Sequence, residues 1–519
     1  MTGELTIDVA TARWDSIGAA VHRSAVRAPN TIALRFGTRT WTYGELDRAA
    51  NRVAHRLVDA GLAPGQRLAA FGRNSDAYLL AWLGCVRAGV IHVPVNFALR
   101  PDELGYIVRQ SGASAVVCDP ALAPNVAGSA GASVIPLQGR FHGGGDAALD
   151  ILSAALDERN DDSPVDLAND ERIAQILYTS GTTADPKGAV MTHAAFLAHY
   201  ESVIVSADLG AADRTLDALP LYHSAQMHCF IMPHLMLGAT SVLIDAPDPT
   251  LCLRLIEEHR VTSFFAPPTV WISLLRHDDF DRRDLTCLER IYYGASIMPV
   301  PVLEELRRRL PSAKPYNCYG QSEIGPLATV LRPEEHDARP ASAGRPVLNV
   351  ETRVVDEQMN DVPPGVPGEI VHRSPQLLLR YWDKPEETRQ AFAGGWFHSG
   401  DVALRDEEGY IFVTDRVKDV INTGGIVVSS REVEEALFTH PSVYEVAVIA
   451  LPDPKWIEAV TAVVVLRPGA DANEEMLVEH ARTTLAPYKL PKRVIFTDTL
   501  PRNTAGKLLK RELRATYAK

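Results

Sequence analysis

The chain has 519 residues and a formal net charge of −13, with 46% hydrophobic and 23% charged residues. This composition is ordinary for a soluble globular protein, and the length allows several domain-sized units with a large buried core. The acidic balance argues against a nucleic-acid-binding surface, which needs a basic face. The six scattered cysteines form no CxxC pair, so we expect free thiols and neither a zinc site nor a redox motif.

The sequence also predicts where the protein acts. It does not open on a basic segment followed by an apolar one, so no signal peptide is indicated. The longest apolar candidate for a spanning helix, residues 81–95, is short and carries Arg87. We therefore expect a cytoplasmic protein without a transmembrane segment.

The first part of the chain alternates between predicted helices and strands. Residues 14–60 predict a helix, a short hairpin and a second helix that ends at Gly61. Residues 68–94 have a strand–helix–strand pattern, and residues 101–118 add a helix and a strand. Such crossover units build parallel sheets. Residues 121–162 are rich in Ala, Gly and Asp and predict a loose connector.

The rest of the chain predicts three further regions. Residues 240–310 continue the alternation of strands and helices. Residues 344–415 contain short alternating strands separated by turns, which predict a small antiparallel barrel-like subdomain. Residues 416–519 predict a compact α+β unit with a basic tail, and we place the domain boundary at Asp415. The predicted fold class is α/β, with parallel-rich sheets and helices in a large N-terminal domain of residues 1–415 and a small C-terminal domain.

A turn rich in hydroxyls and glycine follows the buried strand predicted at residues 172–178. Residues 178–188 read Tyr-Thr-Ser-Gly-Thr-Thr-Ala-Asp-Pro-Lys-Gly. Backbone N–H groups and hydroxyls donate to phosphate oxygens, and the ammonium adds positive charge, so the turn predicts a polyphosphate-binding loop. It is not a Walker A loop, because Pro186 precedes the lysine and Gly188 replaces the residue that would hold magnesium. Taken alone, the turn also fits a flexible surface loop. A helix is expected to begin after Thr192.

Further stretches place polar or small residues at predicted element ends. Small residues at 294–296 end a strand where a planar ring could approach the backbone. Residues 317–323 offer an aromatic plane, a hydroxyl and a carboxylate within seven positions. An aspartate lies on a turn at 401, and a lysine lies on a flexible tip at 507.

Three histidines could suggest a metal site. His223, His228 and His234 are spaced five and six residues apart, which does not fit the helical zinc motif of two histidines four residues apart. We interpret them as core or pocket histidines.

In this order and spacing, the motifs resemble the adenylate-forming superfamily of acyl-CoA synthetases, luciferases and nonribosomal-peptide adenylation domains. The resemblance extends from about Trp41 to Leu513 and is greatest to fatty-acyl- and aryl-CoA ligases. It implies an acid–thiol ligase that uses ATP and Mg²⁺ to make an acyl-adenylate and then a thioester with CoA as co-substrate. The expected partner is a small-molecule carboxylic acid, either fatty or bulky and aromatic. In the family, the C-terminal domain is mobile between the two steps.

The resemblance also implies roles for individual residues. Glu323 binds Mg²⁺, Ser322 contacts the α-phosphate, and Lys507 relieves the repulsion between the attacking carboxylate and that phosphate. Tyr319 stacks on adenine and Asp401 binds the ribose. The nucleotide-binding set is Thr179, Ser180, Gly181, Thr182, Thr183, Lys187, Gly294, Ala295, Asn317, Tyr319, Asp401 and Arg416. The acyl-pocket set is His223, Met227, Trp271, Gly320 and Gly325, whose glycines would leave room for a bulky group. The thiolation face is Lys418, Gly424 and Gly425, and the hinge is Asp415.

Three positions depart from the family pattern and keep an alternative open. Ala184 replaces a glycine and Ser322 replaces a threonine. Ile426 and Val427 follow the two glycines where acyl-CoA ligases have Glu-Asn. The alternative is an adenylate-forming ligase with weak or no CoA transfer, which passes the acyl group to a partner enzyme or carrier protein.

Two other classes of function are weighed against these. A kinase-like or ATP-hydrolysing enzyme would release ADP, and the lack of a Walker A loop argues against it. A nucleotide-binding protein without catalysis would have no need of Lys507, Glu323 and Asp401 together.

Overall fold

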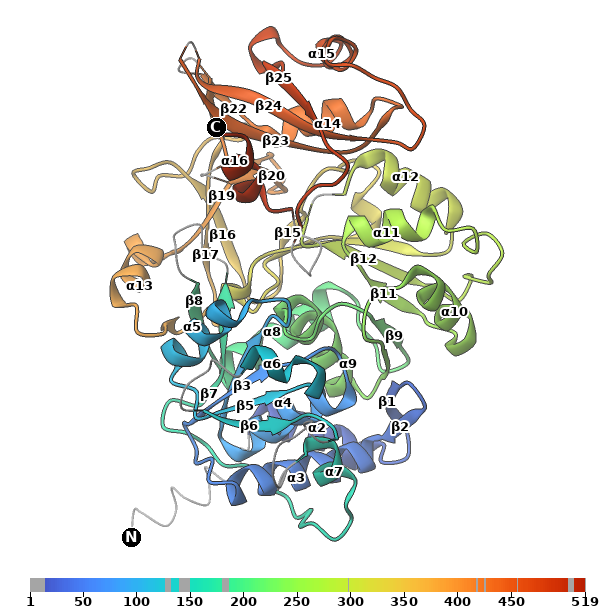
Figure 1. The fold of residues 1–519 in the computed structure, drawn as a ribbon, viewed down its shortest axis with the longest axis vertical. Helices are drawn as coiled ribbons and strands as arrows, with labels where there is room; N and C mark the ends of the chain where they lie inside the picture. The colour runs from blue at the N-terminus through green and yellow to red at the C-terminus, as the bar shows by residue number, and fades with distance from the viewer. Residues whose placement is uncertain are drawn as a thin grey trace.

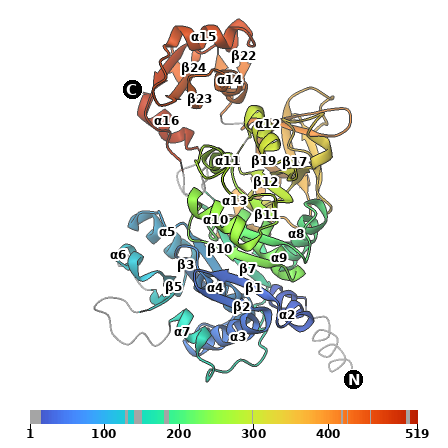
Figure 2. The same cartoon turned by 90° about the vertical axis from the view of Figure 1, so that its right-hand side faces the viewer.

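The structure, a computed structural model, describes residues 15–126, 132–139, 150–179, 186–296, 298–416, 419–423, 426–454, 456–502 and 508–518. Within these ranges the strands form four sheets, three of them before residue 417 and one after it. Helices α14 to α16 lie at the end of the molecule opposite to α2 and α3 in both views (Figures 1 and 2).

The seven-stranded sheet is parallel in its interior and antiparallel at the edge where β8 lies between β7 and β18. Its order is β18-β8-β7-β4-β3-β5-β6. Its strands span Arg67–Phe71 (β3), Ile91–Val95 (β4), Ala115–Cys118 (β5), Ser133–Pro136 (β6), Ile173–Thr179 (β7), Lys187–Thr192 (β8) and Arg380–Tyr381 (β18).

The nine-stranded sheet has a parallel core with antiparallel strands at both ends. Its order is β15-β14-β13-β12-β11-β9-β10-β1-β2. Its strands span Ile32–Phe36 (β1), Arg39–Thr42 (β2), Arg214–Asp217 (β9), Thr240–Leu243 (β10), Ser263–Phe265 (β11), Arg290–Gly294 (β12), Lys314–Tyr319 (β13), Thr329–Leu331 (β14) and Arg345–Pro346 (β15).

Helices fill the space between these two sheets and cover their outer faces. One apolar cluster joins β1 and β3 through α3, α4 and α8, so these helices lie between the sheets. Helix α4 is buried along its whole length, as its nearly uniform apolar sequence requires. The helices span Ile17–Arg27 (α2), Tyr43–Asp59 (α3), Asp76–Ala88 (α4), Pro101–Ser111 (α5), Ala123–Val126 (α6), Ile151–Leu156 (α7), His193–Ser206 (α8), Met232–Leu237 (α9), Pro249–His259 (α10), Pro268–Leu275 (α11) and Val300–Arg309 (α12).

The predicted antiparallel subdomain is a four-stranded sheet in the order β16-β17-β19-β20, followed in the chain by a five-stranded C-terminal sheet. The subdomain contains Glu351–Val355 (β16), Gly368–Arg373 (β17), Pro385–Ala391 (α13), Phe397–Arg405 (β19) and Ile411–Arg416 (β20). The C-terminal part contains Ile421–Thr423 (β21), Ile426–Val428 (β22), Ser430–Phe438 (α14), Val443–Asp453 (β23), Ile457–Leu466 (β24), Glu474–Arg482 (α15), Arg493–Phe496 (β25) and Lys510–Tyr517 (α16).

One expectation about local structure was wrong. The supposed loose connector contributes β6 to the seven-stranded sheet, and Ile151 and Ala155 of α7 are fully buried in the core between the sheets. The helix predicted to begin after Thr192 is confirmed as α8, whose first turn Thr192 caps. Between the hydroxyl-rich turn and Thr192 lies a strand that the sequence did not predict, β8, which pairs antiparallel with β7.

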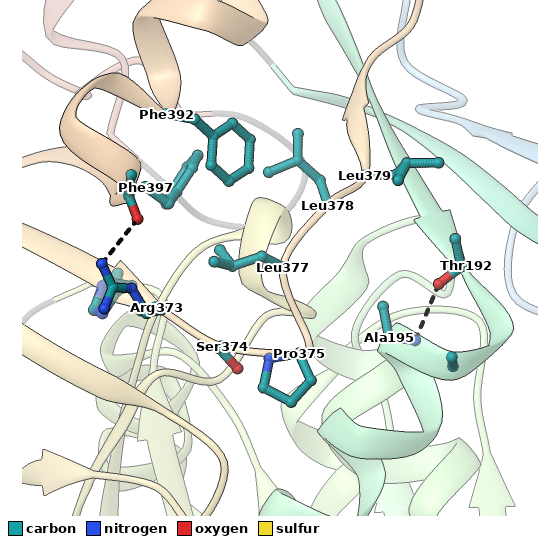
Figure 3. A pocket seen from close by; sticks show the side chains of 13 residues that line it. Thr192, Ala195, Arg373, Ser374, Pro375, Leu377, Leu378, Leu379, Phe392 and Phe397 are labelled. Carbon is teal, nitrogen blue, oxygen red and sulfur yellow. Dashed lines mark hydrogen bonds between the residues drawn. The ribbon is translucent and has the colours of Figure 1, made fainter.

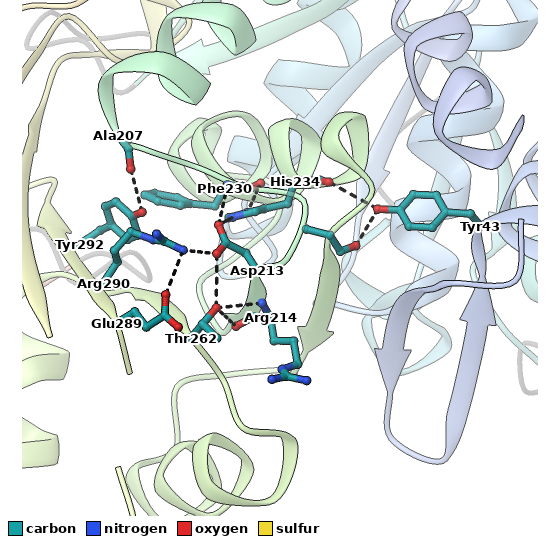
Figure 4. A network of polar contacts seen from close by, with 12 residues as sticks. Tyr43, Ala207, Asp213, Arg214, Phe230, His234, Thr262, Glu289, Arg290 and Tyr292 are labelled. Carbon is teal, nitrogen blue, oxygen red and sulfur yellow. Dashed lines mark hydrogen bonds and ion pairs between the residues drawn. The ribbon is translucent and has the colours of Figure 1, made fainter. Parts of the chain in front are cut away.

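A buried polar network ties the nine-stranded sheet to the helices beneath it (Figure 4). The carboxylate of Asp213 accepts hydrogen bonds from Arg290 and from the backbone N–H of Gly210, and it lies 3.3 Å from Nε2 of His234. These partners hold the pKa of Asp213 below its usual value although burial acts in the opposite direction. The network satisfies a charge that would otherwise be costly inside the core.

Two further expectations concern the whole chain. All six cysteines are free thiols. In the described part of the chain, every helix is too short or too polar to cross a membrane.

Candidate active site

The candidate site is built where neighbouring parallel strands end. Strands β12 and β13 run side by side with Gly294 opposite Cys318, so their carboxyl ends meet at one edge of the nine-stranded sheet. In α/β sheets such edges bind ligands. A cleft of about 870 Å³ opens here between the sheet and the C-terminal part of the chain. Its lining includes six residues of the predicted sets, namely Ala295, Asn317, Tyr319, Gly320, Asp401 and Asp415.

Close backbone approach explains the small residues at the end of β12. A Cβ atom on Gly294 would overlap the carbonyl oxygen of Cys318 on the neighbouring strand. Ala295, the next residue, has a φ of +61°, a left-handed conformation that lets the chain turn away from the sheet. The end of β12 therefore has no room for a larger side chain against β13.

The predicted adenine and ribose residues are in direct contact. The hydroxyl of Tyr319 donates a 2.6 Å hydrogen bond to Oδ2 of Asp401, whose side chain is buried. Asp401 lies opposite Arg416 in the β19–β20 pair, as their shared predicted role requires. Asn317 donates to the carbonyl of Ser342 at 2.8 Å. The sequence alone does not reveal the bond between Tyr319 and Asp401, because 82 residues separate them.

The predicted magnesium ligand is held by two hydroxyl groups. Glu323 is only 8% exposed, and its Oε1 accepts hydrogen bonds from Thr179 at 3.1 Å and from Tyr381 at 3.2 Å. Ser322 lies 2.8 Å from the hydroxyl of Ser224. A buried carboxylate in contact with Thr179, the residue that precedes most of the predicted phosphate-binding turn, suits a hard cation such as Mg²⁺.

Lys187, the lysine of the hydroxyl-rich turn, lies at the start of β8. Its ammonium is 5.4 Å from the centre of the Tyr381 ring. Tyr381 is thus a member of the site that the sequence analysis missed. It lies 58 residues beyond Glu323 in a strand of two residues, and no motif marks it.

A second, smaller cavity of about 450 Å³ lies between the segment 373–379 and the start of α8 (Figure 3). Leu377, Leu378, Phe392 and Phe397 converge on it from one side, and the start of α8 closes the other. The backbone N–H of Leu378 donates to the carbonyl of Glu323 at 2.8 Å. The segment that walls this cavity therefore also fixes the backbone of the predicted magnesium ligand.

The two large apolar residues of the predicted acyl pocket pack into different clusters. Met227 is buried in the π-helix η2 (Ala225–Ile231) and belongs to the core between the two sheets. Nδ1 of His223 accepts a 3.3 Å hydrogen bond from the N–H of Ala225. Trp271 is buried in a separate core on the outer face of the nine-stranded sheet, where its indole donates to Tyr292.

Gly320 and Gly325, the two glycines of the predicted acyl pocket, pack closely against other parts of the chain. A Cβ atom on Gly320 would overlap the carbonyl of Pro326. Gly325 has a φ of +97°, and a Cβ there would press against the ring of His199. Both glycines therefore allow close packing of this loop, whatever space they leave for a substrate.

The interpretation of His228 and His234 as core histidines is confirmed. Both are completely buried, and the described residues contain no cluster of three metal-ligating side chains. His228 lies in a chain of hydrogen bonds, with Tyr200 at 2.8 Å on Nδ1 and Gln175 at 2.8 Å on Nε2. Burial lowers the pKa of His228 well below its ordinary value, so the ring is neutral.

The predicted hinge lies at a junction between elements. Asp415 is buried near the end of β20, and its Oδ2 accepts a 2.7 Å hydrogen bond from the N–H of Ser430, the first residue of α14. Of Arg416, Ile426 and Val427 only the backbone is described. Eight predicted site residues lie outside the described residues: Ser180, Gly181, Thr182, Thr183, Lys418, Gly424, Gly425 and Lys507.

A cleft at the edge of the sheet and the hydrogen-bonded carboxylate of Glu323 are features of enzymes that use nucleotides. A family model described as AMP-binding enzyme matches residues 21–382, and one described as AMP-binding enzyme C-terminal domain matches residues 432–507. The chain therefore belongs to the AMP-binding enzyme family, as its motifs predict.

Individual relatives cover nearly the whole chain. Feruloyl-CoA synthase of an Amycolatopsis species is 37% identical over 506 residues, 97% of this chain and 100% of that protein. ScoC of Streptomyces coeruleorubidus, a fatty acid–[acyl-carrier-protein] ligase, is 33% identical over 503 residues, 95% of each chain. The crystal structure of ATP-bound MatB from Rhodopseudomonas palustris is similar with a TM-score of 0.89 at 30% identity, covering 97% of this chain and 99% of that chain. This likeness confirms the predicted α/β fold class.

Proposed function

We propose that the protein is an AMP-forming acid–thiol ligase that activates a hydrophobic carboxylic acid with ATP and transfers the acyl group to CoA. The observation that carries the proposal is the contact of Tyr319 with Asp401 in the strand-end cleft, with Glu323 held by two hydroxyl groups four residues after Tyr319. Tyr319 offers a ring for adenine, Asp401 offers a buried carboxylate for ribose hydroxyls, and Glu323 is fixed beside the phosphate-binding turn. Membership of the AMP-binding family supports the same assignment.

The first half-reaction joins the acid to AMP. A carboxylate oxygen attacks the α-phosphorus of ATP, the bond to the β-phosphate oxygen breaks, and pyrophosphate leaves. Mg²⁺, when bound at Glu323, would offset the charge of the phosphates. Lys187 lies beside the turn on the pyrophosphate side, and we assign to Lys507 the role of stabilising the charge that accumulates at the α-phosphate.

The second half-reaction makes the thioester. The thiol sulfur attacks the acyl carbon, AMP leaves with the electron pair of the broken C–O bond, and the thiol loses its proton. A turn of the C-terminal part about Asp415 would exchange Lys507 for the hairpin of β21 and β22 at the site. Hinges of this kind absorb their motion in a few residues at element ends.

A hydrophobic acid is the substrate class that the relatives support. Feruloyl-CoA synthase is named for an aromatic acid, and ScoC is named for a fatty acid. A second candidate function is transfer of the acyl group to a carrier protein. Ile426 and Val427 favour it, because they replace the usual pair on the thiolation hairpin, and the name of ScoC agrees.

A panel of carboxylic acids tests the proposal directly. Ferulate, decanoate and shorter acids are each supplied with MgATP, with and without CoA, and pyrophosphate, AMP and ADP are measured. Pyrophosphate and AMP that depend on the acid, with turnover raised by CoA, are expected. Turnover that ignores CoA but rises with an acyl carrier protein would favour the second candidate. Release of ADP, or no acid-dependent pyrophosphate with any acid, would refute the assignment.

A further inference from the structure

Tyr381 makes two separate contacts with residues of the proposed site. Its hydroxyl donates to Oε1 of Glu323 at 3.2 Å, and the ammonium of Lys187 lies 5.4 Å from the centre of its ring. The metal carboxylate and the cation of the phosphate-binding turn are therefore both in contact with one side chain. Tyr381 itself is 8% exposed.

The backbone of Tyr381 is fixed on both sides. Strand β18 adds to β8, where Tyr381 lies opposite Ala189, two residues after Lys187. The N–H of Trp382 donates to the carbonyl of Gly188 at 2.7 Å, and the N–H of Tyr381 donates to the hydroxyl of Thr388 at 3.0 Å. These backbone hydrogen bonds therefore fix the position from which the Tyr381 ring extends into the site.

The neighbouring residue strengthens this attachment. Arg380 forms two hydrogen bonds of 2.7 Å with the carboxylate of Glu171, which lies just before β7. A bidentate pair of this kind fixes geometry as well as adding energy. A strand of two residues would be a weak element alone, and these contacts explain how it holds its register.

The hydroxyl of Tyr381 acts as a hydrogen-bond donor to the carboxylate of Glu323. A neutral phenol donates to the carboxylate without cancelling its charge. Thr179 and Tyr381 both donate to Oε1, so this oxygen is engaged by two protein groups. In the described part of the chain, Oε2 of Glu323 forms no hydrogen bond. It is the oxygen that can face a cation.

We infer that Tyr381 is a positioning residue of the adenylation step, which orients Glu323 toward Mg²⁺ through its hydroxyl and Lys187 toward the phosphates through its ring. The inference rests on the proposed function, because it gives Tyr381 a task only where MgATP binds. The inference gives the hydroxyl and the ring of Tyr381 separate tasks. Substitutions can remove the hydroxyl alone or the hydroxyl together with the ring.

Two substitutions separate the tasks. Tyr381→Phe removes the hydroxyl and keeps the ring, so the Mg²⁺ concentration for half-maximal ATP–pyrophosphate exchange should rise about 10-fold or more. The KM for ATP at saturating Mg²⁺ should change less than about two-fold, because the contact of Lys187 is kept. Tyr381→Leu removes both contacts and should raise both quantities. Thr179→Val removes the other donor to Oε1 and should raise the Mg²⁺ requirement in the same direction.

The chain offers a matched control. Tyr410 donates its hydroxyl to the buried carboxylate of Glu335 at 2.8 Å, the same chemical arrangement outside the proposed site. Tyr410→Phe should leave the Mg²⁺ requirement and the KM for ATP unchanged. A binding measurement without turnover completes the test, in which Mn²⁺ is titrated into the enzyme–ATP complex and free Mn²⁺ is followed by electron paramagnetic resonance. Tyr381→Phe should weaken Mn²⁺ binding about 10-fold as well.

The outcomes distinguish the inference from the function on which it rests. A wild-type enzyme that shows no acid-dependent exchange with any acid would refute the proposed function and the inference with it. Normal wild-type exchange, with Tyr381→Phe matching wild type in both Mg²⁺ requirement and Mn²⁺ binding, would refute the inference alone. An equal loss in Tyr381→Phe and Tyr410→Phe would also refute it, since a general loss of stability would then explain both.

Discussion

Replacing Lys510 by methionine should loosen the link between the hinge and the segment that follows Lys507. Lys510 is the first residue of α16, and its ammonium lies 2.8 Å from Oε1 of Glu434 and 2.6 Å from the hydroxyl of Ser430. Ser430 in turn donates its N–H to Asp415 at 2.7 Å. One chain of contacts thus joins the predicted hinge, the start of α14 and the start of α16.

The exposure of the ion pair sets the size of the effect. The side chains of Lys510 and Glu434 are 16% and 21% exposed. Exposed pairs contribute about 0.2–1 kcal/mol, whereas removing one partner of a fully buried pair costs about 3–5 kcal/mol. An intermediate cost of about 2 kcal/mol is expected for Lys510→Met. Because 1.4 kcal/mol is a factor of ten, local opening around Glu434 should become about 30-fold more frequent.

The rate of hydrogen exchange at the backbone amide of Val448 measures the opening around Glu434. Its N–H donates to Oε1 of Glu434 at 2.7 Å, so it exchanges with solvent when the cluster opens. Lys510→Met should speed its exchange about 30-fold, and adding Glu434→Gln should restore most of the protection by removing the unpaired charge. Lys489→Met is the matched control. Its ion pair with Glu432 is more exposed, so it should change exchange by only a few-fold.

The effect should also depend on pH. Burial raises the pKa of Glu434, while Lys510 acts to lower it, so the substitution should raise this pKa further. An acid whose pKa is higher in the folded state than in the unfolded state destabilises the fold as the pH rises through that pKa. Lys510→Met should therefore cost more at pH 8 than at pH 5, and Glu434→Gln should abolish the difference. Equal exchange in wild type and Lys510→Met at both pH values would refute the reasoning.

Three further predictions concern the site and the core. Lys507→Ala should leave ATP binding nearly intact and reduce adenylate formation about 10²–10³-fold in ATP–pyrophosphate exchange, and near-normal exchange would remove Lys507 from its assigned role. Gly294→Ala should raise the KM for ATP at least several-fold, because its Cβ would displace the end of β13, whereas Gly210→Ala, with open space around it, should not. Stability should fall as the pH drops below about 6.5, since burial lowers the pKa of His92 and of His199 to about 3 and the unfolded chain takes up those protons. The free energy of unfolding in urea, plotted against pH, should have a slope smaller by about 1.4 kcal/mol per pH unit in His92→Gln than in wild type. An unchanged slope would contradict the assignment of the acid sensitivity to His92.

Much of the fold could be predicted because its periodic segments are long and apolar. Strand β5 and helix α5 begin and end where the hydrophobic pattern predicts, and capping residues such as Thr192 mark the helix starts. The errors fell on short elements. Helix α7 has six residues and β8 follows a turn, so neither has a period long enough to stand out from its polar surroundings.

The candidate site was predictable in its residue types and not in its contacts. Motifs marked Glu323, Asp401, Thr179 and Tyr319, and the structure shows Glu323 in contact with Thr179 and Asp401 in contact with Tyr319. The partner Tyr381 lies in a strand of two residues that is stable only because it joins β8, and pairing of that kind is a property of the folded chain. The acyl pocket stays a prediction. Met227 and Trp271 pack into different cores, and local sequence does not specify which face of a sheet a residue supports.

Three described hydrogen bonds cross the predicted hinge at Asp415. Ser429 donates to the carbonyl of Thr414 at 2.7 Å, Arg431 donates to the carbonyl of Val413, and Ser430 donates to Asp415. All three bonds attach the start of α14 to β20. A turn about Asp415 would have to break them first, and each is a bond to a main-chain carbonyl or a single carboxylate that water can replace. The joint can therefore open at a modest cost, while Tyr319, Asp401 and Glu323 are fixed by the large domain. Under the proposed function, adenylation would need that fixed part together with Lys507, and the choice between CoA and a carrier protein would depend on the hairpin of β21 and β22 in the C-terminal part.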